Sequence, residues 1–255
     1  MTTLLLRLAG PMQSWGTQSR FSERDCGHEP SKSGVIGLIC AALGKPRRED
    51  PSDRSHPKLA DLAALDMGVR VDREGVVQRD FQTAGGGTLT GDRYGVARAR
   101  GVVGDTVTSS RYFIADAQYL VGLEGDDALL RRIDRALRHP VWPLGLGRRS
   151  YLPDPPVWLP DGLSRKPLRL ALREYPWLAR TAAEAAQMRA ASAERPLTLR
   201  LVLESADDAS ADIRCDVPLC FAERRFAPRF VTTETMTLTS DLIREDTYVS
   251  HTPGH

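Results

Sequence analysis

The sequence predicts an α+β fold: an RRM-like or ferredoxin-like sheet with a projecting arm and a small C-terminal antiparallel β extension. The first 150 residues read as strand, helix, strands, helix and strand, the βαββαβ order of such sheets. Residues 83–110 hold seven glycines without apolar periodicity, so they form either an arm that a partner orders or a disordered insertion. The last third of the chain is rich in strand-like segments.

The composition is typical of a globular protein. Of 255 residues, 41% are hydrophobic and 27% are charged. The longest apolar run, Gly34 to Leu43, is too short to span a membrane, and the N-terminal residues show no secretory signal. Four irregularly spaced cysteines do not indicate a disulfide framework. We therefore expect a cytoplasmic protein without a membrane partner.

The basic residues are nearly all arginines, since only four of the 35 are lysines. Arginine binds phosphate through its planar fork and stacks on bases, so this bias is compatible with an RNA partner. A GC-rich genome produces the same bias. A net charge of +2 does not by itself require a polyanionic partner.

The N-terminal elements follow from periodicity and capping signals. Alternating leucines predict a strand over Thr2–Leu8. The non-periodic stretch over 10–30 is too long for an ordinary connection, which is typical of a functional or mobile segment. Ser31 or Ser33 caps a buried helix over Gly34–Leu43, which ends at the glycine that follows.

The remaining elements complete the predicted sheet and its extension. Met67–Phe81 is predicted to be a hairpin that turns at 73–75, and Tyr112–Leu123 to be a single strand. A helix follows over 126–139 with an apolar stripe, and Pro153–Pro160 is a linker. The tail is predicted to contain a helix over 176–193 and strands over 197–204, 214–221 and 229–238. We place the RRM-like sheet with its arm, which we call the palm, at 1–160. The helix and β region that pack on it lie at 161–255.

Catalytic motifs are missing from the sequence. It has no metal-binding spacing of His and Cys, no nucleophile elbow and no phosphate-binding loop. His139 is expected to close a helix, and the other histidines lie in predicted loops or near the chain end. A metal-independent endoribonuclease needs only a positioned base and acid, so that alternative stays open. We expect no metal ion and no cofactor.

Three segments have the chemistry of single-stranded RNA binding. The first follows the N-terminal strand, where Gln13 and Trp15 lie among small residues and the tryptophan could stack on a base. The alternative is a tryptophan that covers a sheet edge. The second is the start of the first helix, where Ser31, Lys32 and Ser33 could hold a phosphate. The alternative is simple N-capping.

The third segment is a glycine–arginine turn after the second long helix. Its glycines allow close backbone approach to a phosphate chain, and its arginines neutralise that chain. The alternative is a solvated basic turn. The RNA-binding candidates from the turn are Gly147, Arg148, Arg149 and Ser150.

Several stretches together resemble the Cas-five family of the RAMP superfamily, in the branch that serves type I-E CRISPR Cascade. Two N-terminal stretches are the most specific: Leu4–Gly16, which reads LLLRLAGPMQSWG, and Pro30–Leu38, which reads PSKSGVIGL. The resemblance continues through Arg79–Thr83, Arg111–Ala117, Leu146–Ser150, Asp216–Pro218 and Arg225–Val231. It covers nearly the whole chain, although the alanine-rich stretch over 179–193 has no confident counterpart.

The resemblance implies a non-catalytic subunit of a surveillance complex. Its palm would be RRM-like, and a β-hairpin thumb would be inserted at about 84–109. It implies three partners: the 5′ handle of the CRISPR RNA, the terminal copy of the backbone subunit CasC and the large subunit CasA. Contact with target DNA is left open. Arg111 resembles an arginine that contacts handle bases, and the glycine–arginine turn resembles the glycine-rich loop of RAMP proteins.

One branch of the family cuts precursor RNA with a tyrosine and a Lys–His pair. This sequence contains no Lys-His dipeptide, so we expect no nuclease, with metal-independent RNA processing as the alternative. The remaining RNA-binding candidates are Arg20, Arg24 and Tyr112, and those of the thumb are Arg93, Tyr94, Arg98 and Arg100.

Overall fold

The computed structural model describes residues 1–17, 22–85, 88–89, 92–93, 96, 106–206 and 211–244. The fold is α+β and is dominated by antiparallel sheets. The main sheet has seven strands in the order β10-β1-β9-β4-β11-β13-β12, all paired antiparallel. Its strands are β1 (Thr2–Ala9), β4 (Asp66–Arg73), β9 (Gln118–Gly125), β10 (Trp158–Ser164), β11 (Leu197–Ser205), β12 (Asp212–Cys220) and β13 (Arg225–Leu238).

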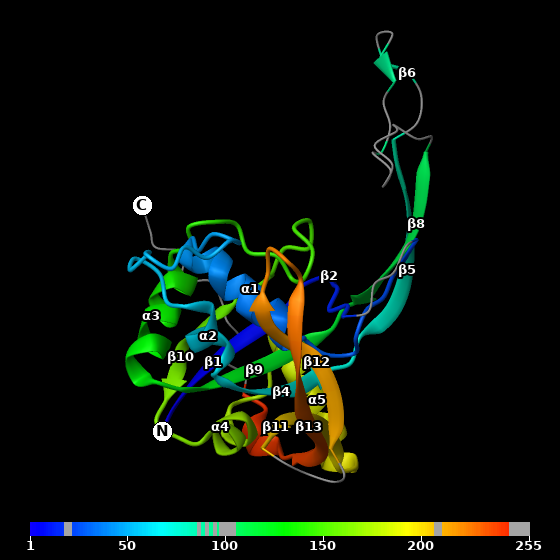
Figure 1. The fold of residues 1–255 in the computed structure, drawn as a ribbon. Helices are drawn as coiled ribbons and strands as arrows, with labels where there is room; N and C mark the ends of the chain where they lie inside the picture. Colours follow the sequence, from blue (N-terminus) through cyan, green and yellow to red (C-terminus); the bar gives the residue numbers. More distant parts are fainter. Residues whose placement is uncertain are drawn as a thin grey trace, which may run out of the picture.

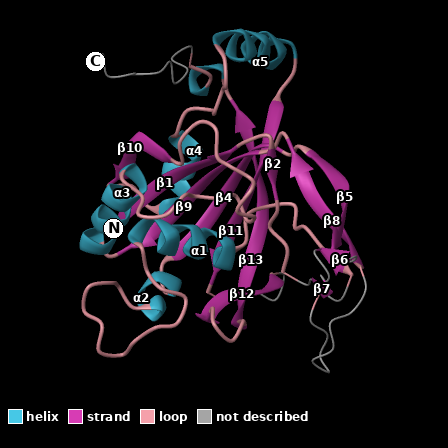
Figure 2. Ribbon diagram, turned by 90° about the horizontal axis from the view of Figure 1, so that it is seen from above, coloured by secondary structure: helices cyan, strands magenta, loops and turns pink. Residues whose placement is uncertain are grey.

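Helices cover both faces of the main sheet (Figure 2). One face packs on α1 (Lys32–Leu43), α2 (Leu59–Ala63) and α3 (Asp127–Arg138), and the other on α4 (Leu168–Glu174) and α5 (Ala182–Glu194). A short 3-10 helix, η1 (Ser240–Leu242), follows β13. Because both faces are covered, the interior strand β1 is buried along nearly its whole length, with Leu4 facing one core and Leu5 the other.

The caps of the two long helices agree with the sequence prediction. Ser31 accepts a hydrogen bond from the backbone N–H of Gly34 at the start of α1, and Gly44 ends that helix in the left-handed conformation. Asp126 caps α3 in the same way by accepting from Leu129. No helix in the described part of the chain is long and apolar enough to cross a membrane.

A long two-stranded arm leaves the main sheet (Figure 1). It is built from β5 (Val76–Ala84) and β8 (Val107–Ala115), which pair antiparallel along their full lengths. Two short strands, β2 (Met12–Gln13) and β3 (Glu23–Arg24), flank β8. Beyond the stem, β6 (Thr88–Leu89) pairs with β7 (Asp92–Arg93).

The arm corrects two predictions. The predicted hairpin over 67–81 is wrong, because β4 pairs with β9 and β11 while β5 pairs with β8. The predicted strand over 112–123 is two strands, β8 and β9. The segment from β4 to β5 and the segment from β8 to β9 each pass between the main sheet and the arm at the same place, where Gly75 has φ +71° and Asp116 has φ +66°. What looked like a turn is a bend in one long ribbon, so the arm begins at residue 76, earlier than the predicted 84.

The C-terminal strands continue the main sheet, because β11 pairs with β4 over four residues. The helix predicted over 176–193 is α5, which begins six residues later behind its cap Thr181. The sequence analysis missed α4 and also β10, which overlaps the predicted proline-rich linker and forms the edge of the sheet beside β1.

Candidate nucleic-acid interface

A groove beside the arm strand β8 collects four arginines from four separate segments. Its cavity measures about 440 Å³ and is lined by Ser14, Gly16, Arg24, Asp25, Arg111, Gly147, Arg148 and Arg224. Four guanidinium groups thus share the lining with one carboxylate. A concave site with this excess of arginine suits an anion with several charges, such as a nucleic-acid backbone. We call it the arginine groove.

Two of the arginines are adjacent in register. Strand β3 pairs parallel with β8 so that Arg24 lies opposite Arg111. Arg111 donates from Nε to the hydroxyl of Ser109, 3.1 Å away on the same strand. Arg24 makes no ion pair with any other residue that the structure describes. Because β2 and β3 both pair with β8, the non-periodic segment over 10–30 forms one wall of the groove.

The third arginine is held rigidly by the glycine–arginine turn. Arg148 donates to the backbone oxygen of Tyr112 at 2.9 Å and to the hydroxyl of Tyr151 at 2.8 Å. Gly147 has φ +85°, and a Cβ at this position would lie 1.7 Å from the backbone oxygen of Ser14. Only glycine fits there, because the turn packs directly on the backbone of the 14–16 segment.

Arg224 is the arginine that the sequence analysis missed. It lies in the turn between β12 and β13, with φ +53°. This turn reaches the groove because β12 forms the edge of the main sheet and also contacts α1 and α2. The neighbouring Arg225 pairs with Glu223 at 2.8 Å instead and does not line the groove. Sequence gives no signal that separates these two arginines.

The structure brings together four of the predicted RNA-binding residues, namely Arg24, Arg111, Gly147 and Arg148. Arg149 and Ser150 are exposed, and Arg149 lines a neighbouring cavity together with Ser33. Tyr112 contributes its backbone oxygen, which accepts from both Ser14 Oγ and Arg148.

The prediction of an exposed stacking tryptophan is wrong. Trp15 is only 1% exposed, and its indole N–H donates to Gln13 Oε1 at 3.1 Å. Gln13 is also buried and donates to the backbone oxygens of Leu8 and Ala117. The ring turns inward over Gly34, where any side chain would overlap it. Both residues hold the start of the groove wall in place from within the core.

The prediction of a free phosphate site at the start of α1 is also wrong. Lys32 is 2% exposed and pairs with Glu204 at 2.8 Å, while its backbone N–H donates to Asp216 at 2.7 Å. Ser31 is buried and acts as the N-cap. Carboxylates from β11 and β12 therefore occupy the positive end of the helix, where we expected a phosphate.

Some predicted residues lie outside the described part of the chain. These are Arg20 in the N-terminal segment and Tyr94, Arg98 and Arg100 in the predicted thumb. The backbone of Arg93 belongs to β7.

The groove lacks the residues expected of a nuclease. None of the histidines that the structure describes lines it. Cys26 follows the lining residue Asp25 in sequence. Its sulfur accepts a hydrogen bond from the backbone N–H of Trp15 at 3.3 Å, and burial raises the pKa of this thiol. Within the described ranges, no group of three or more His, Cys, Asp or Glu residues is arranged to bind a metal ion.

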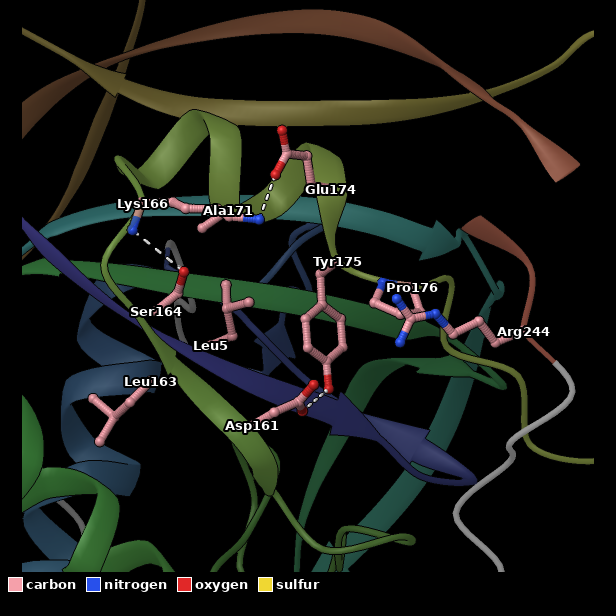
Figure 3. A pocket seen from close by; sticks show the side chains of 10 residues that line it. All are labelled: Leu5, Asp161, Leu163, Ser164, Lys166, Ala171, Glu174, Tyr175, Pro176 and Arg244. Carbon is pink, nitrogen blue, oxygen red and sulfur yellow. Dashed lines mark hydrogen bonds and ion pairs between the residues drawn. The ribbon is translucent and has the colours of Figure 1, made fainter. Parts of the chain in front are cut away.

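A smaller cavity on the α4 side of the sheet is lined by side chains that pair with one another (Figure 3). Its volume is about 190 Å³. Tyr175 donates to Asp161 at 2.7 Å, and Lys166 pairs with Glu174 at 2.5 Å. Acidic and basic groups are mixed there, so this cavity lacks the excess of arginine that marks the arginine groove.

Comparison with known proteins gives a consistent assignment. A family model described as CRISPR-associated protein (Cas_Cas5) matches residues 3–232. The Escherichia coli (strain K12) protein "CRISPR system Cascade subunit CasD" is 28% identical over 179 residues, which are 68% of this chain and 77% of that protein.

Two solved structures match along almost the whole chain. One, described as "Crystal structure of Cas protein", is 43% identical with a TM-score of 0.67 and covers 94% of this chain and 97% of its own. The other, "CRISPR RNA-guided surveillance complex", is 34% identical with a TM-score of 0.70 and covers 95% and 93%. The family match spans most of the sequence and confirms the resemblance. The chain belongs to the Cas5 family of CRISPR-associated proteins.

Proposed function

We propose that this protein is a non-catalytic subunit of a type I-E Cascade surveillance complex that caps the 5′ handle of the CRISPR RNA. The arginine groove carries the proposal, because Arg24, Arg111, Arg148 and Arg224 converge there from segments that are distant in sequence. The relatives named CasD and surveillance complex support the setting. In the proposal, the groove holds the backbone of the handle at the foot of the arm.

The chemistry of the groove suits single-stranded RNA. Guanidinium groups that line an open groove neutralise phosphates and release counterions, so binding weakens steeply with salt. Gly16 and Gly147 line the same cavity, and a Cβ at either position would overlap the backbone of Asp25 or Ser14, so both glycines are needed to shape the wall of the groove. Arg148 is preorganised by its two hydrogen bonds, so it loses little conformational freedom on binding.

The fold supports the proposed division into palm and thumb. The strand order β10-β1-β9-β4, with α1 and α3 on one face, is that of a ferredoxin-like or RRM-like sheet, which we propose as the palm. The arm then corresponds to the thumb, which we propose holds the terminal CasC subunit. CasA would lie beside it, and the assembled complex would be cytoplasmic.

The direct test is the salt dependence of RNA binding. We expect Arg24→Ala combined with Arg111→Ala to lower affinity for a labelled repeat-derived RNA. The slope of log K against log salt should fall by about 0.7 for each lost phosphate contact. Fluorescence anisotropy at several salt concentrations measures both quantities.

Matched controls come from arginines outside the groove. Arg131→Ala on α3 and Arg225→Ala at the start of β13 each remove one exposed arginine that is paired with a carboxylate. Both variants should keep the wild-type affinity and slope. If they weaken binding as much as the groove variant, the protein binds RNA through general charge and the proposed site is wrong. RNA recovered intact on a denaturing gel supports a non-catalytic role, and specific cleavage contradicts it.

A further inference from the structure

A second, larger cavity adjoins the arginine groove. It measures about 700 Å³ and lies between α1 and the loop over 141–149, with Phe221 at the end of β12 on its border. Gly147 and Arg148 line both cavities, so the two form one continuous surface. This volume lies within the range of small-ligand sites.

The floor of this cavity includes a face of α1 with small residues. Ser33, Gly37 and Ala41 recur at every fourth residue of α1, so they share one face of that helix and present almost no side-chain bulk. At Gly37, a Cβ would have Phe221 Cζ as its nearest neighbour, at 3.8 Å. The position is therefore open to the cavity, and a larger side chain there would occupy the cavity rather than disturb the core.

An exposed aromatic ring forms one wall. Trp142 is 46% exposed, although its backbone is fixed: its N–H donates to Ala41 O at 3.2 Å, and that of Val141 donates to Ala42 O at 3.0 Å. A tryptophan on a rigid backbone that leaves its ring open costs little conformational entropy when it stacks on a ligand.

The charge at the rim is positive. Arg47, Arg148 and Arg149 line the cavity, whereas Lys45 is paired with Glu49 at 2.8 Å. Arg47 and Arg149 make no ion pair with any other residue in the described ranges. Aromatic rings, a floor of small residues and arginines without ion pairs together match one nucleotide, whose base stacks while its phosphate stays at the rim.

We propose that this cavity takes a single unstacked base of the RNA, held against Trp142, while the backbone continues into the arginine groove. The inference rests on the proposed function and adds a base-reading site to a groove that otherwise contacts phosphates. The observation behind it is the juxtaposition of Trp142, Phe221 and the small-residue face of α1, next to Arg148 and Arg149.

The test combines a protein variant with a change in the RNA. In the full-length wild-type chain, we expect one nucleotide of a labelled repeat-derived RNA to be critical: removing its base should weaken binding about tenfold. Trp142→Ala should bind the abasic RNA and the unmodified RNA with equal affinity. The loss of affinity would then be assigned to the interaction between that base and Trp142. Anisotropy titrations at one fixed salt concentration give the four affinities.

Three further variants separate stacking from folding. Trp142→Phe keeps an aromatic ring, so it should retain most of the affinity while the quenching of tryptophan emission by RNA disappears. Gly37→Leu should place a side chain on the floor of the cavity between α1 and Phe221, where it blocks the base and abolishes the abasic effect without unfolding the chain. Val141→Ala changes an exposed neighbour that does not line the cavity, and it should behave as wild type.

The outcomes distinguish the two proposals. If RNA binds with the expected salt slope but no abasic position depends on Trp142, the base pocket is wrong and the proposed function stands. Unchanged RNA binding in Gly37→Leu also overturns the pocket and favours a protein loop as its occupant. If wild-type protein binds no repeat RNA at any salt concentration, both proposals fail.

Discussion

The role of an individual residue depends on the side chains that it contacts, and these can be distant in sequence. Lys32 has the position of a phosphate ligand at a helix start, yet Glu204, 172 residues away, neutralises it. The sequence identifies the helix and its cap but cannot show which carboxylate reaches it. Trp15 is similar, since only the fold shows that its ring packs on Gly34.

Lys32 should therefore matter for stability rather than for RNA phosphate contacts. Lys32→Met leaves the carboxylate of Glu204 buried without its closest cation, and we expect a loss of about 3 kcal/mol in the free energy of unfolding. Urea denaturation measures it. At temperatures where the variant is folded, the salt slope of RNA binding should equal that of wild type. A reduced slope would restore the phosphate role for Lys32.

Gly147 differs from Lys32, because the structure supplies a local physical reason for the residue type: the turn packs on the backbone of Ser14. Gly147→Ala would force a Cβ into the backbone of Ser14 and a side chain into the left-handed region. We expect a loss of about 3 kcal/mol or more in stability, or a displaced turn with weakened RNA binding.

The matched control is Gly37→Ala, which has space for a Cβ inside a helix and should stabilise the chain by about 0.5–1 kcal/mol. Equal urea midpoints for the two variants would contradict this reading of the turn.

At the scale of elements, local signals predicted the helices α1 and α3 well and the sheet connections poorly. Caps and apolar periodicity locate α1 and α3 almost to the residue. The bend between β4 and β5 was missed because Arg73-Glu74-Gly75 has the composition of a tight turn. Pairing partners, which decide between a turn and a bend, are tertiary information that one segment does not contain.

The bend is tied to α5 by charge. Asp116 sits at the bend, and its carboxylate accepts from Arg180 at 2.6 Å, just before α5. Arg73 and Glu184 form a second ion pair beside it. The hydrogen bond from Arg180, reinforced by both arginine charges, lowers the pKa of Asp116. The alanine-rich helix, whose role the sequence left open, thus holds the foot of the arm.

This link should depend on pH. Because the pKa of Asp116 is lower in the folded protein, its contribution is full above the unfolded value of about 4 and is lost as pH falls through the folded value. We expect Asp116→Asn to destabilise the chain at pH 7 by less than about 1 kcal/mol, since the pair is partly exposed. Urea curves of both proteins between pH 7 and pH 3 should converge at the acidic end. A difference that grows toward acid would have the wrong sign for this carboxylate.

At the scale of the whole molecule, the C-terminal strands complete the groove that begins in the N-terminal half. The buried pair of Asp216 and Arg229, at 2.6 Å, joins β12 to β13, and Asp216 also accepts from the start of α1. This contact fixes the edge of the sheet whose turn delivers Arg224. The sequence predicted the tail strands but did not decide whether they form a small subdomain or extend the main sheet, and the structure shows that they extend it toward the arginine groove.

The measurement that tests the central claim most directly maps where RNA touches the protein. The full-length chain is cross-linked by ultraviolet light to a repeat-derived RNA that carries 4-thiouridine, and the modified peptides are identified by mass spectrometry. The account predicts cross-links in the peptides that contain residues 14–17, 24–25, 109–112, 142–149 and 224. Cross-links confined to α4, α5 and the cavity lined by Tyr175 and Asp161, on the other face of the sheet, would contradict it.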